Sequence, residues 1–103
     1  MHKIFWVIFM NNSELVGVVI DPGHGGSDPG ASGNNQYEKD YTLKISKYMY
    51  DQFKKLGIPV TLTRDADVTL SPTERVNKIL SAYGDDPNVI VISNHLNAGG
   101  GTG

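Results

Sequence analysis

The chain has 103 residues, of which 39% are hydrophobic and 19% charged, and its formal net charge is −2. This balance is typical of a folded domain with a buried core, and it gives no electrostatic reason to expect nucleic acid or an anionic membrane surface as a partner. The chain contains no cysteine, which excludes a disulfide framework, a thiolate metal site and a cysteine nucleophile.

Residues 1–14 contain a short apolar run, Ile4–Met10. Because a helix needs about 20 apolar residues to cross a bilayer, this run is too short for a membrane span. No small-x-small cleavage site follows it, so it is not a convincing signal peptide. Two interpretations stay open: an additional edge strand, or an extension derived from a vector. We expect an extension over residues 1–14 and a folded unit over residues 15–103.

The first predicted elements are a strand, a long loop and a helix. Leu15–Ile20 is apolar on both faces, as expected for a parallel strand covered by helices. The loop over residues 21–36 exceeds the usual connection of about two to six residues, which favours a functional role. Apolar residues then recur at helical spacing over Tyr37–Leu56, and Gly57 suits the position just after a helix.

The second half of the chain repeats this alternation. Ile58–Thr63 reads as a strand, and the sequence SPTE at residues 71–74 combines a capping serine, a first-turn proline and a capping-box glutamate at a helix start. A third strand is predicted over Val89–Ile92. The order strand-helix-strand-helix-strand predicts an α/β fold with a mostly parallel sheet and flanking helices. Since glycines follow the last strand directly, we expect a fragment with an uncovered sheet edge.

Two histidines fall at the same edge of the predicted sheet. His24 follows the first strand by four residues, and His95 lies at or just past the end of the third strand. Open parallel sheets bind ligands beyond the carboxyl ends of their strands. Glu38 closes the long loop and can fold back towards this edge. Two histidines and a carboxylate, with a fourth position left for water, are typical of a catalytic zinc site.

The residues alone leave other interpretations of this site open. A single histidine in a loop is most often an ordinary polar surface residue. Asp21, Asp28 or Asp40 could supply the carboxylate in place of Glu38. The first two of these aspartates could equally be turn formers, because they stand beside proline or glycine.

Other polar and aromatic residues of the chain also allow more than one role. Arg64, just past the second strand, could orient a substrate carboxylate or pair with Asp65 or Asp67, and the ion pair is the commoner role. The glycine loop fits neither of the usual phosphate-binding patterns, and nothing resembles a nucleophile elbow. The tyrosines at positions 41, 48 and 50 are expected in the core or on the helix surface rather than as a stacking platform.

Four segments carry a family resemblance in chain order. They are VVIDPGHGGSDPGASG (residues 18–33), YEKDYTLKIS (37–46), LTRDADVTLSPTERV (62–76) and SNHLNAGGGTG (93–103). Together they resemble the type 3 N-acetylmuramoyl-L-alanine amidases, zinc enzymes that cut peptidoglycan between muramic acid and the first alanine of the stem peptide. The resemblance covers Val16–Gly103 and implies the N-terminal portion of the family's catalytic domain.

The resemblance implies a site and a cellular setting. His24, Glu38 and His95 match the family's zinc ligands, and Arg64 and Asn97 match positions that shape the site or contact substrate. The implied cofactor is Zn²⁺, the implied partner is peptidoglycan, and the implied place of action is the bacterial cell wall. Secretion and release by lysis both stay open, as do the roles of autolysin, sporulation enzyme and phage lysin.

Two departures from the family pattern qualify this expectation. Asn94 stands where the family has an apolar residue, and burial without hydrogen-bond partners would cost it about 1–3 kcal/mol. No residue here matches the family's catalytic glutamate, which we expect beyond Gly103, so we expect hydrolysis by this chain to be impaired. The alternatives are a non-catalytic cell-wall-binding module and a self-assembling fragment that forms homo-oligomers or exchanges strands through its uncovered edge.

Overall fold

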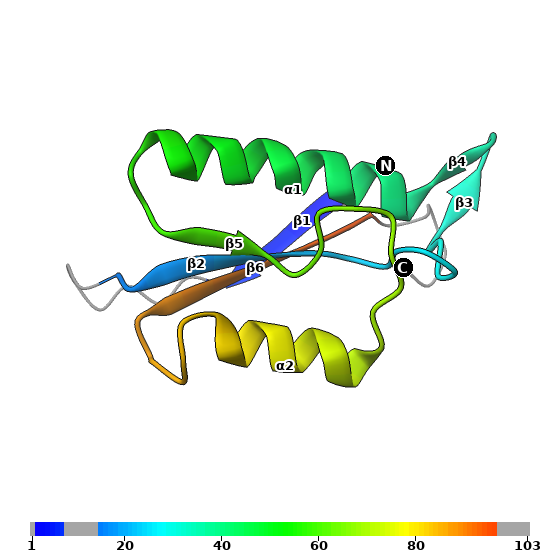
Figure 1. Ribbon diagram of the computed structural model, residues 1–103. Coiled ribbons are helices and arrows are strands. Elements are labelled where there is room, and N and C mark those ends of the chain that lie inside the picture. Colours follow the sequence, from blue (N-terminus) through cyan, green and yellow to red (C-terminus); the bar gives the residue numbers. More distant parts are fainter. Residues whose placement is uncertain (1, 8–14, 97–103) are drawn as a thin grey trace.

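The computed structural model describes residues 2–7 and 15–96. A four-stranded sheet is made of β1 (His2–Val7), β2 (Gly17–Pro22), β5 (Val60–Leu62) and β6 (Val89–Leu96). Helix α1 (Glu38–Lys55) covers one face of the sheet and helix α2 (Pro72–Ala82) covers the other (Figure 1). The strand order is β1-β6-β2-β5. The predicted α/β fold is therefore confirmed.

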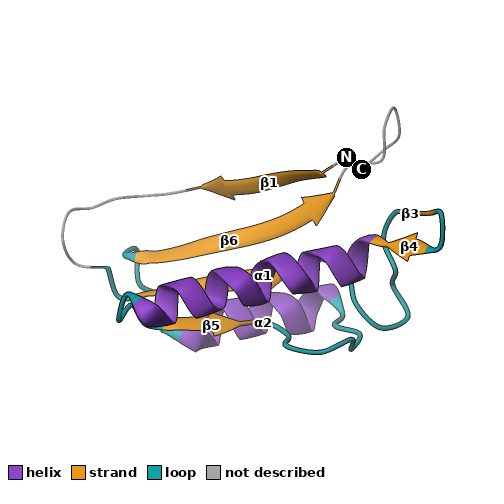
Figure 2. Cartoon of the chain, turned by 90° about the horizontal axis from the view of Figure 1, so that it is seen from above, coloured by secondary structure: helices purple, strands orange, loops and turns teal. Residues whose placement is uncertain are grey.

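The three strands predicted from the sequence run parallel, with β2 between β5 and β6. β1 pairs antiparallel with the outer edge of β6, on the side away from β5 (Figure 2). Residues 2–7 therefore form the additional edge strand that the sequence left open as one of two interpretations. The origin of residues 1–14 stays a prediction.

The core lies between the central strand β2 and helix α1. Every residue of β2 is buried. The core cluster consists of buried aliphatic residues from three neighbouring strands: Val18, Ile20, Val60 and Ile92. Met49 and Phe53 pack against this cluster from α1. A strand that is apolar on both faces is stable only when helices cover both sides of the sheet, and β2 meets this condition.

Both helices carry the end signals that their sequences predict. In α1, acidic residues occupy the first turn and Lys54 and Lys55 the last, which suits the helix dipole. The capping box of α2 is formed: Ser71 Oγ accepts from the Glu74 amide at 3.1 Å, and Glu74 Oε1 accepts from the Ser71 amide at 2.8 Å. The N-terminal end of α2 is thereby set, whereas Tyr37, the residue before α1, makes no side-chain capping bond.

The predicted loop over residues 21–36 contains a small hairpin that the sequence analysis missed. β3 (Ser32–Gly33) pairs antiparallel with β4 (Gln36–Tyr37). Asn34 and Asn35, with φ of 52° and 62°, form the two-residue turn between them. Positive φ at both central positions matches the turn type that tight hairpins favour. The hairpin projects beyond the N-terminal end of α1 (Figure 1).

Among residues 2–7 and 15–96, no helix combines the length and the apolar character that a membrane crossing requires. Asn97 and the final glycines lie outside the described residues.

Candidate metal centre

The side chains of His24, Glu38 and His95 come together at the carboxyl edge of the sheet. One potential ligand atom from each lies within 4.8 Å of the other two. His24 Nε2 is 3.1 Å from Glu38 Oε2, and His95 Nδ1 is 3.4 Å from the same oxygen. The two imidazole rings meet edge to face, with centroids 5.3 Å apart. The structure thus brings together the three residues that the sequence singled out.

Each of the three comes from a different element. His24 follows β2, Glu38 is the first residue of α1, and His95 belongs to β6, which runs to Leu96 and so extends past the predicted strand end. β2 and β6 are neighbours and parallel, which places both histidines at one edge. The hairpin β3–β4 then returns the chain so that α1 begins beside them. The sheet topology therefore explains the convergence.

Glu38 is 2% exposed, and both of its carboxylate oxygens are oriented by backbone amides. Oε1 accepts from the Ala31 amide at 2.9 Å, and Oε2 accepts from the Leu96 amide at 2.9 Å. Burial raises the pKa of Glu38, but these hydrogen bonds and the two histidines lower it by more, so the pKa lies below its ordinary value. The side chain is an ionised carboxylate held in a fixed position.

Asp28 orients the first histidine. Its Oδ2 lies 2.9 Å from His24 Nδ1, and this hydrogen bond is the main reason that the pKa of Asp28 is lowered. A carboxylate at Nδ1 favours the tautomer that carries its proton there, which leaves the lone pair of Nε2 facing Glu38 and His95. A ring nitrogen supported in this way is the usual arrangement around a metal-binding histidine.

This set of donors fits a zinc ion. Two neutral imidazole nitrogens and one carboxylate oxygen are ligands that zinc prefers, and three protein ligands leave a position open for water or substrate. The competing carboxylates are placed elsewhere. Asp28 lies on the far side of the His24 ring, Asp21 bonds to other side chains, and Asp40 is exposed on α1.

Two glycines provide the space in which the three side chains meet. A Cβ atom on Gly23 would lie 2.6 Å from His95 Cε1. A Cβ atom on Gly30 would lie 2.6 Å from both Glu38 Oε1 and His24 Cδ2, and Gly30 has a φ of 69°. Both contacts are far shorter than real side chains tolerate, so the loop must carry glycine at these positions.

Arg64 is 3% exposed and holds the backbone of the loop that carries His24. Its guanidinium donates to the carbonyl oxygens of Pro22 at 3.3 Å and Gly23 at 3.0 Å, and to that of Lys39 in α1 at 3.0 Å. Burial is the largest cause of its lowered pKa. These contacts favour a role for Arg64 in shaping the site over the commoner role of an ion pair with Asp65 or Asp67.

Arg75, in the first turn of α2, contacts the loop that carries His24, and the sequence analysis missed it. It forms an ion pair with Asp21 at 2.6 Å and donates to the carbonyl oxygens of Pro22 at 2.8 Å and His24 at 3.1 Å. His24 has a φ of 66°, a backbone conformation that residues other than glycine rarely adopt. Arg75 therefore helps to hold His24, a candidate metal ligand, in this conformation.

The loop after β5 fastens the other side of the glycine loop. Asp67 Oδ1 accepts from the Gly26 amide at 2.7 Å, and Thr69 Oγ1 accepts from the Ser27 amide at 2.9 Å. Lys39 links this loop to the glycine loop as well, because its ammonium group donates to Asp67 Oδ2 at 3.0 Å and to the Gly26 carbonyl at 2.9 Å. The loop is rich in glycine, yet its backbone is hydrogen-bonded on both sides.

Asn94, the departure noted in the sequence, is 1% exposed. Its Nδ2 donates to Ser46 Oγ at 2.8 Å, so a buried serine of α1 satisfies half of its amide. Within the described part of the chain, Asn94 Oδ1 has no hydrogen-bond partner. The hydrogen-bond partner that burial of Asn94 requires is therefore present for the amide nitrogen but not for the amide oxygen.

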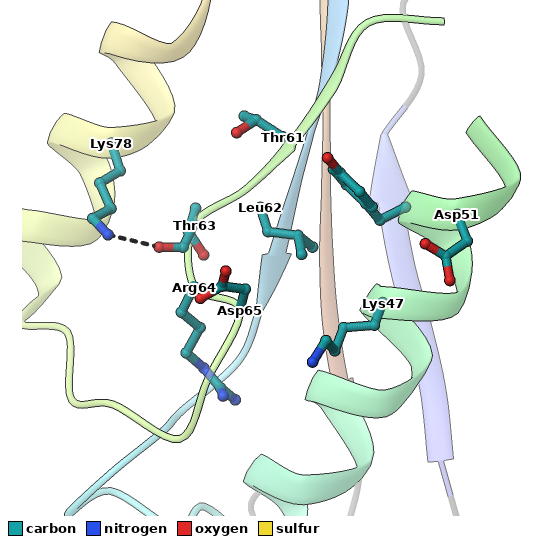
Figure 3. Close-up of a pocket in the computed structure, with 9 residues that line it drawn as sticks. Lys47, Asp51, Thr61, Leu62, Thr63, Arg64, Asp65 and Lys78 are labelled. Carbon is teal, nitrogen blue, oxygen red and sulfur yellow. Dashed lines mark hydrogen bonds between the residues drawn. The ribbon is translucent and has the colours of Figure 1, made fainter. Parts of the chain in front are cut away.

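A separate hollow of about 480 Å³ lies along β5, between α1 and α2 (Figure 3). Lys47 and Asp51 reach it from α1 and Lys78 from α2, and Lys78 Nζ donates to the Thr63 carbonyl at 3.0 Å. None of the three candidate metal ligands lines this hollow. The candidate chemistry therefore sits elsewhere, at the carboxyl edge of the sheet.

Comparison with known proteins assigns the chain and its fold to one family. Residues 18–103 match the profile of a family described as N-acetylmuramoyl-L-alanine amidase. The chain belongs to the type 3 N-acetylmuramoyl-L-alanine amidase family. The match begins within β2 and includes all three candidate metal ligands, so the resemblance seen in the sequence is confirmed.

Individual amidases agree with this family membership. N-acetylmuramoyl-L-alanine amidase CwlM of Bacillus licheniformis is 42% identical over 91 residues, which is 86% of this chain and 34% of that protein. A sporulation-specific amidase of Bacillus subtilis is 40% identical over 93 residues, with the same coverage of 86% and 34%. The chain thus spans about a third of the length of these relatives.

A solved structure shows the same fold. The N-acetylmuramoyl-L-alanine amidase from Clostridium difficile 630 superposes with a TM-score of 0.72 at 35% identity. The superposition covers 82% of this chain and 45% of that structure. The described α/β unit therefore corresponds to part of an amidase domain.

Proposed function

We propose that the chain forms the zinc-binding part of a peptidoglycan amidase, which hydrolyses the amide bond between N-acetylmuramic acid and L-alanine. The observation that carries this proposal is the meeting of His24, Glu38 and His95 within 4.8 Å in a member of the amidase family. The names of the relatives support the substrate, and an action at the bacterial cell wall follows from that substrate. Whether the protein is secreted or released by lysis stays a prediction.

The described residues would hold the metal and keep its surroundings rigid. When bound, zinc would lower the pKa of a water molecule to about 7 and polarise the amide carbonyl. Glu38 is kept ionised by two backbone amides, and Asp28 sets the orientation of the His24 ring. Arg64 and Arg75 fix the backbone on which His24 lies. Such a preformed site needs little rearrangement during the reaction.

The general base is a separate requirement. Hydrolysis needs a group that takes a proton from the attacking water and gives it to the leaving amine. The two carboxylates that contact the histidines are already engaged, Glu38 between both rings and Asp28 on His24 Nδ1. We therefore infer that residues 2–7 and 15–96 bind the metal without supplying the base, and that the 103-residue chain hydrolyses peptidoglycan poorly.

The experiment is an assay of purified cell walls with the zinc-loaded chain, in which newly released alanine amino groups and muropeptides are measured. We expect zinc-dependent release about 10²- to 10⁴-fold slower than with a full-length relative such as CwlM, which is the usual contribution of a general base. Glu38→Gln should reduce release to background. Release that survives both this change and chelation would contradict the metal site, and turnover equal to that of CwlM would contradict the missing base.

A different result would favour the alternative function. If the zinc-loaded chain sediments with cell walls but releases nothing above background, a non-catalytic wall-binding module describes it better.

A further inference from the structure

The face that helix α1 buries against the sheet is polar near the metal centre. Glu38, Thr42 and Ser46 are the buried residues of α1, at 2%, 0% and 0% exposure. They recur at every fourth position, so they lie one above another on a single face of the helix. A helix normally turns apolar side chains towards a sheet, because burying a polar group costs free energy unless it is hydrogen-bonded. The partners of these side chains therefore show what this face is for.

Thr42, one turn after Glu38, holds the loop that carries His24. Its Oγ1 donates to the carbonyl oxygen of Gly23 at 2.7 Å, and Gly23 directly precedes His24. The same hydroxyl oxygen accepts from Arg64 Nη2 at 3.2 Å. The next buried residue of α1 after Glu38 is thus bonded to the backbone beside a candidate metal ligand.

Ser46, a further turn along α1, is bonded to the strand that carries His95. Ser46 Oγ accepts from Asn94 Nδ2 at 2.8 Å, and Asn94 directly precedes His95. The backbone carbonyl of Asn94 also accepts from the Gly23 amide at 3.0 Å. Asn94 therefore contacts α1 through its side chain and the loop after β2 through its carbonyl oxygen, and it is joined to His95 by the chain itself.

The bond between Ser46 and Asn94 gives α1 a fixed position that apolar packing alone does not. Apolar contacts have no direction, whereas hydrogen bonds do. A shift of α1 by one residue would move Glu38 by about 1.5 Å along the helix axis. Among the described residues, Asn94 Oδ1 has no hydrogen-bond partner, which costs free energy. A leucine of similar shape would avoid this cost, so stability does not account for Asn94.

We propose that Ser46 and Asn94 are positioning residues of the metal centre. Their hydrogen bond fixes where α1 lies along β6, and so keeps the Glu38 carboxylate between the rings of His24 and His95. Neither side chain belongs to the candidate ligand set, and both act on Glu38 through the helix. This role rests on the proposed metal-binding function and extends it to a pair of residues outside the site.

The test begins with Ser46→Ala and Asn94→Leu, each of which removes the bond. Zinc affinity, measured by competition with a chromogenic chelator, should fall about 3- to 10-fold, the usual effect of residues that act on a site without touching its ligand. Cobalt-loaded samples give a second readout, because the visible absorption bands of Co²⁺ depend on the geometry of its ligands. We expect these bands to shift or weaken in both variants.

The double variant Ser46→Ala/Asn94→Leu shows whether the bond itself carries the effect. Because both single changes remove the same interaction, the double variant should lose no more zinc affinity than the larger of the two single losses. Losses that add up in the double variant would contradict a role for the bond and overturn the proposal.

Val60→Ala is the matched control for a general loss of stability. Val60 belongs to the core cluster but stands at the start of β5, away from the carboxyl edge of the sheet. Its replacement should lower the midpoint of urea unfolding at least as much as Asn94→Leu does, yet leave zinc affinity and the cobalt bands unchanged. If zinc affinity instead follows the urea midpoint in all three single variants, the role is purely structural and the proposal is wrong.

The metal-free chain separates this proposal from the proposed function. The Ala31 amide donates to Glu38 Oε1 at 2.9 Å, so its proton shift in NMR spectra reports where the carboxylate lies. We expect this signal to move in Ser46→Ala and Asn94→Leu and to stay in Val60→Ala. An unmoved signal in the first two variants would overturn the positioning role even if the chain binds zinc. If the unchanged chain binds no zinc, the metal site is wrong, and the Ala31 signal still decides whether the pair positions Glu38.

Discussion

At the scale of single residues, the candidate metal ligands are oriented by groups that come from several elements. His24 illustrates this, because its ring is fixed by Asp28 and its backbone carbonyl by Arg75. Glu38 is fixed by amides of the long loop and of β6. The geometry of the site therefore depends on residues that would not themselves touch a metal ion.

Asp28 provides a prediction at this scale. Asp28→Asn keeps the shape of the side chain but removes the charge that supports the His24 tautomer. We expect zinc affinity to fall about 10- to 100-fold, as is usual when the hydrogen-bond partner of a metal-binding histidine is changed. Competition with a chromogenic chelator measures this. Asp65→Asn, the same change on an exposed residue of another loop, is the control, and an equal loss in both variants would contradict the role of Asp28.

The sequence predicted some of these residues and not others, for physical reasons. His24 and His95 follow from the rule that the carboxyl ends of parallel strands share an edge. Glu38 could be preferred over the nearby aspartates only through the family resemblance, because spacing does not reveal which carboxylate a loop returns to that edge. Arg75 was missed because its contact with His24 spans 51 positions of the chain and leaves no local pattern.

At the scale of elements, helix α2 supports the candidate site. Its capping box sets where the helix begins, and this places Arg75 against the end of β2. There Arg75 neutralises Asp21, which is 5% exposed and also accepts from Thr63 Oγ1 and Ser93 Oγ. This ion pair connects α2 to the central strand and to the loop that carries His24.

Replacing Arg75 should therefore affect both stability and metal binding. Arg75→Met would leave the buried carboxylate of Asp21 without its cationic partner, and we expect the free energy of unfolding to fall by about 3 kcal/mol. Urea denaturation monitored by circular dichroism measures the change. Arg75→Lys is the matched control. It keeps the charge but not the fork of donors, so its free energy of unfolding should lie between those of the unchanged chain and Arg75→Met. An unchanged midpoint in Arg75→Met would contradict this role.

Long elements with strong end signals were predictable, and short ones were not. The predicted helix over Tyr37–Leu56 agrees with α1 to within a residue at each end. The hairpin β3–β4 escaped notice because strands of two residues are too short to show alternation. Tyr41 and Tyr48 recur at helical spacing but are exposed, since periodicity alone does not fix which part of a broad apolar stripe meets the sheet.

At the scale of the whole molecule, the two edges of the sheet differ. β5 is only three residues long, with Lys47 and Lys78 beside it, and the ammonium group of Lys78 binds the Thr63 carbonyl. Short edge strands flanked by lysine disfavour pairing with another chain. The outer edge of β6 is covered by β1. Beyond β6 the sheet ends at β1. Strand exchange, predicted from an uncovered edge, would therefore use the outer edge of β1 or replace the β1–β6 pairing between copies, and a monomeric mass in solution would contradict it.

The most direct test of the metal centre is the zinc stoichiometry of the metal-depleted chain, measured by calorimetric titration. We predict one zinc ion per chain, with binding lost in Glu38→Gln and in His95→Ala. Asp40→Asn, which removes an exposed carboxylate from the same turn of α1, should bind zinc as the unchanged chain does. No zinc binding, or equal affinity in Glu38→Gln, would contradict the assignment of these three residues as the metal site.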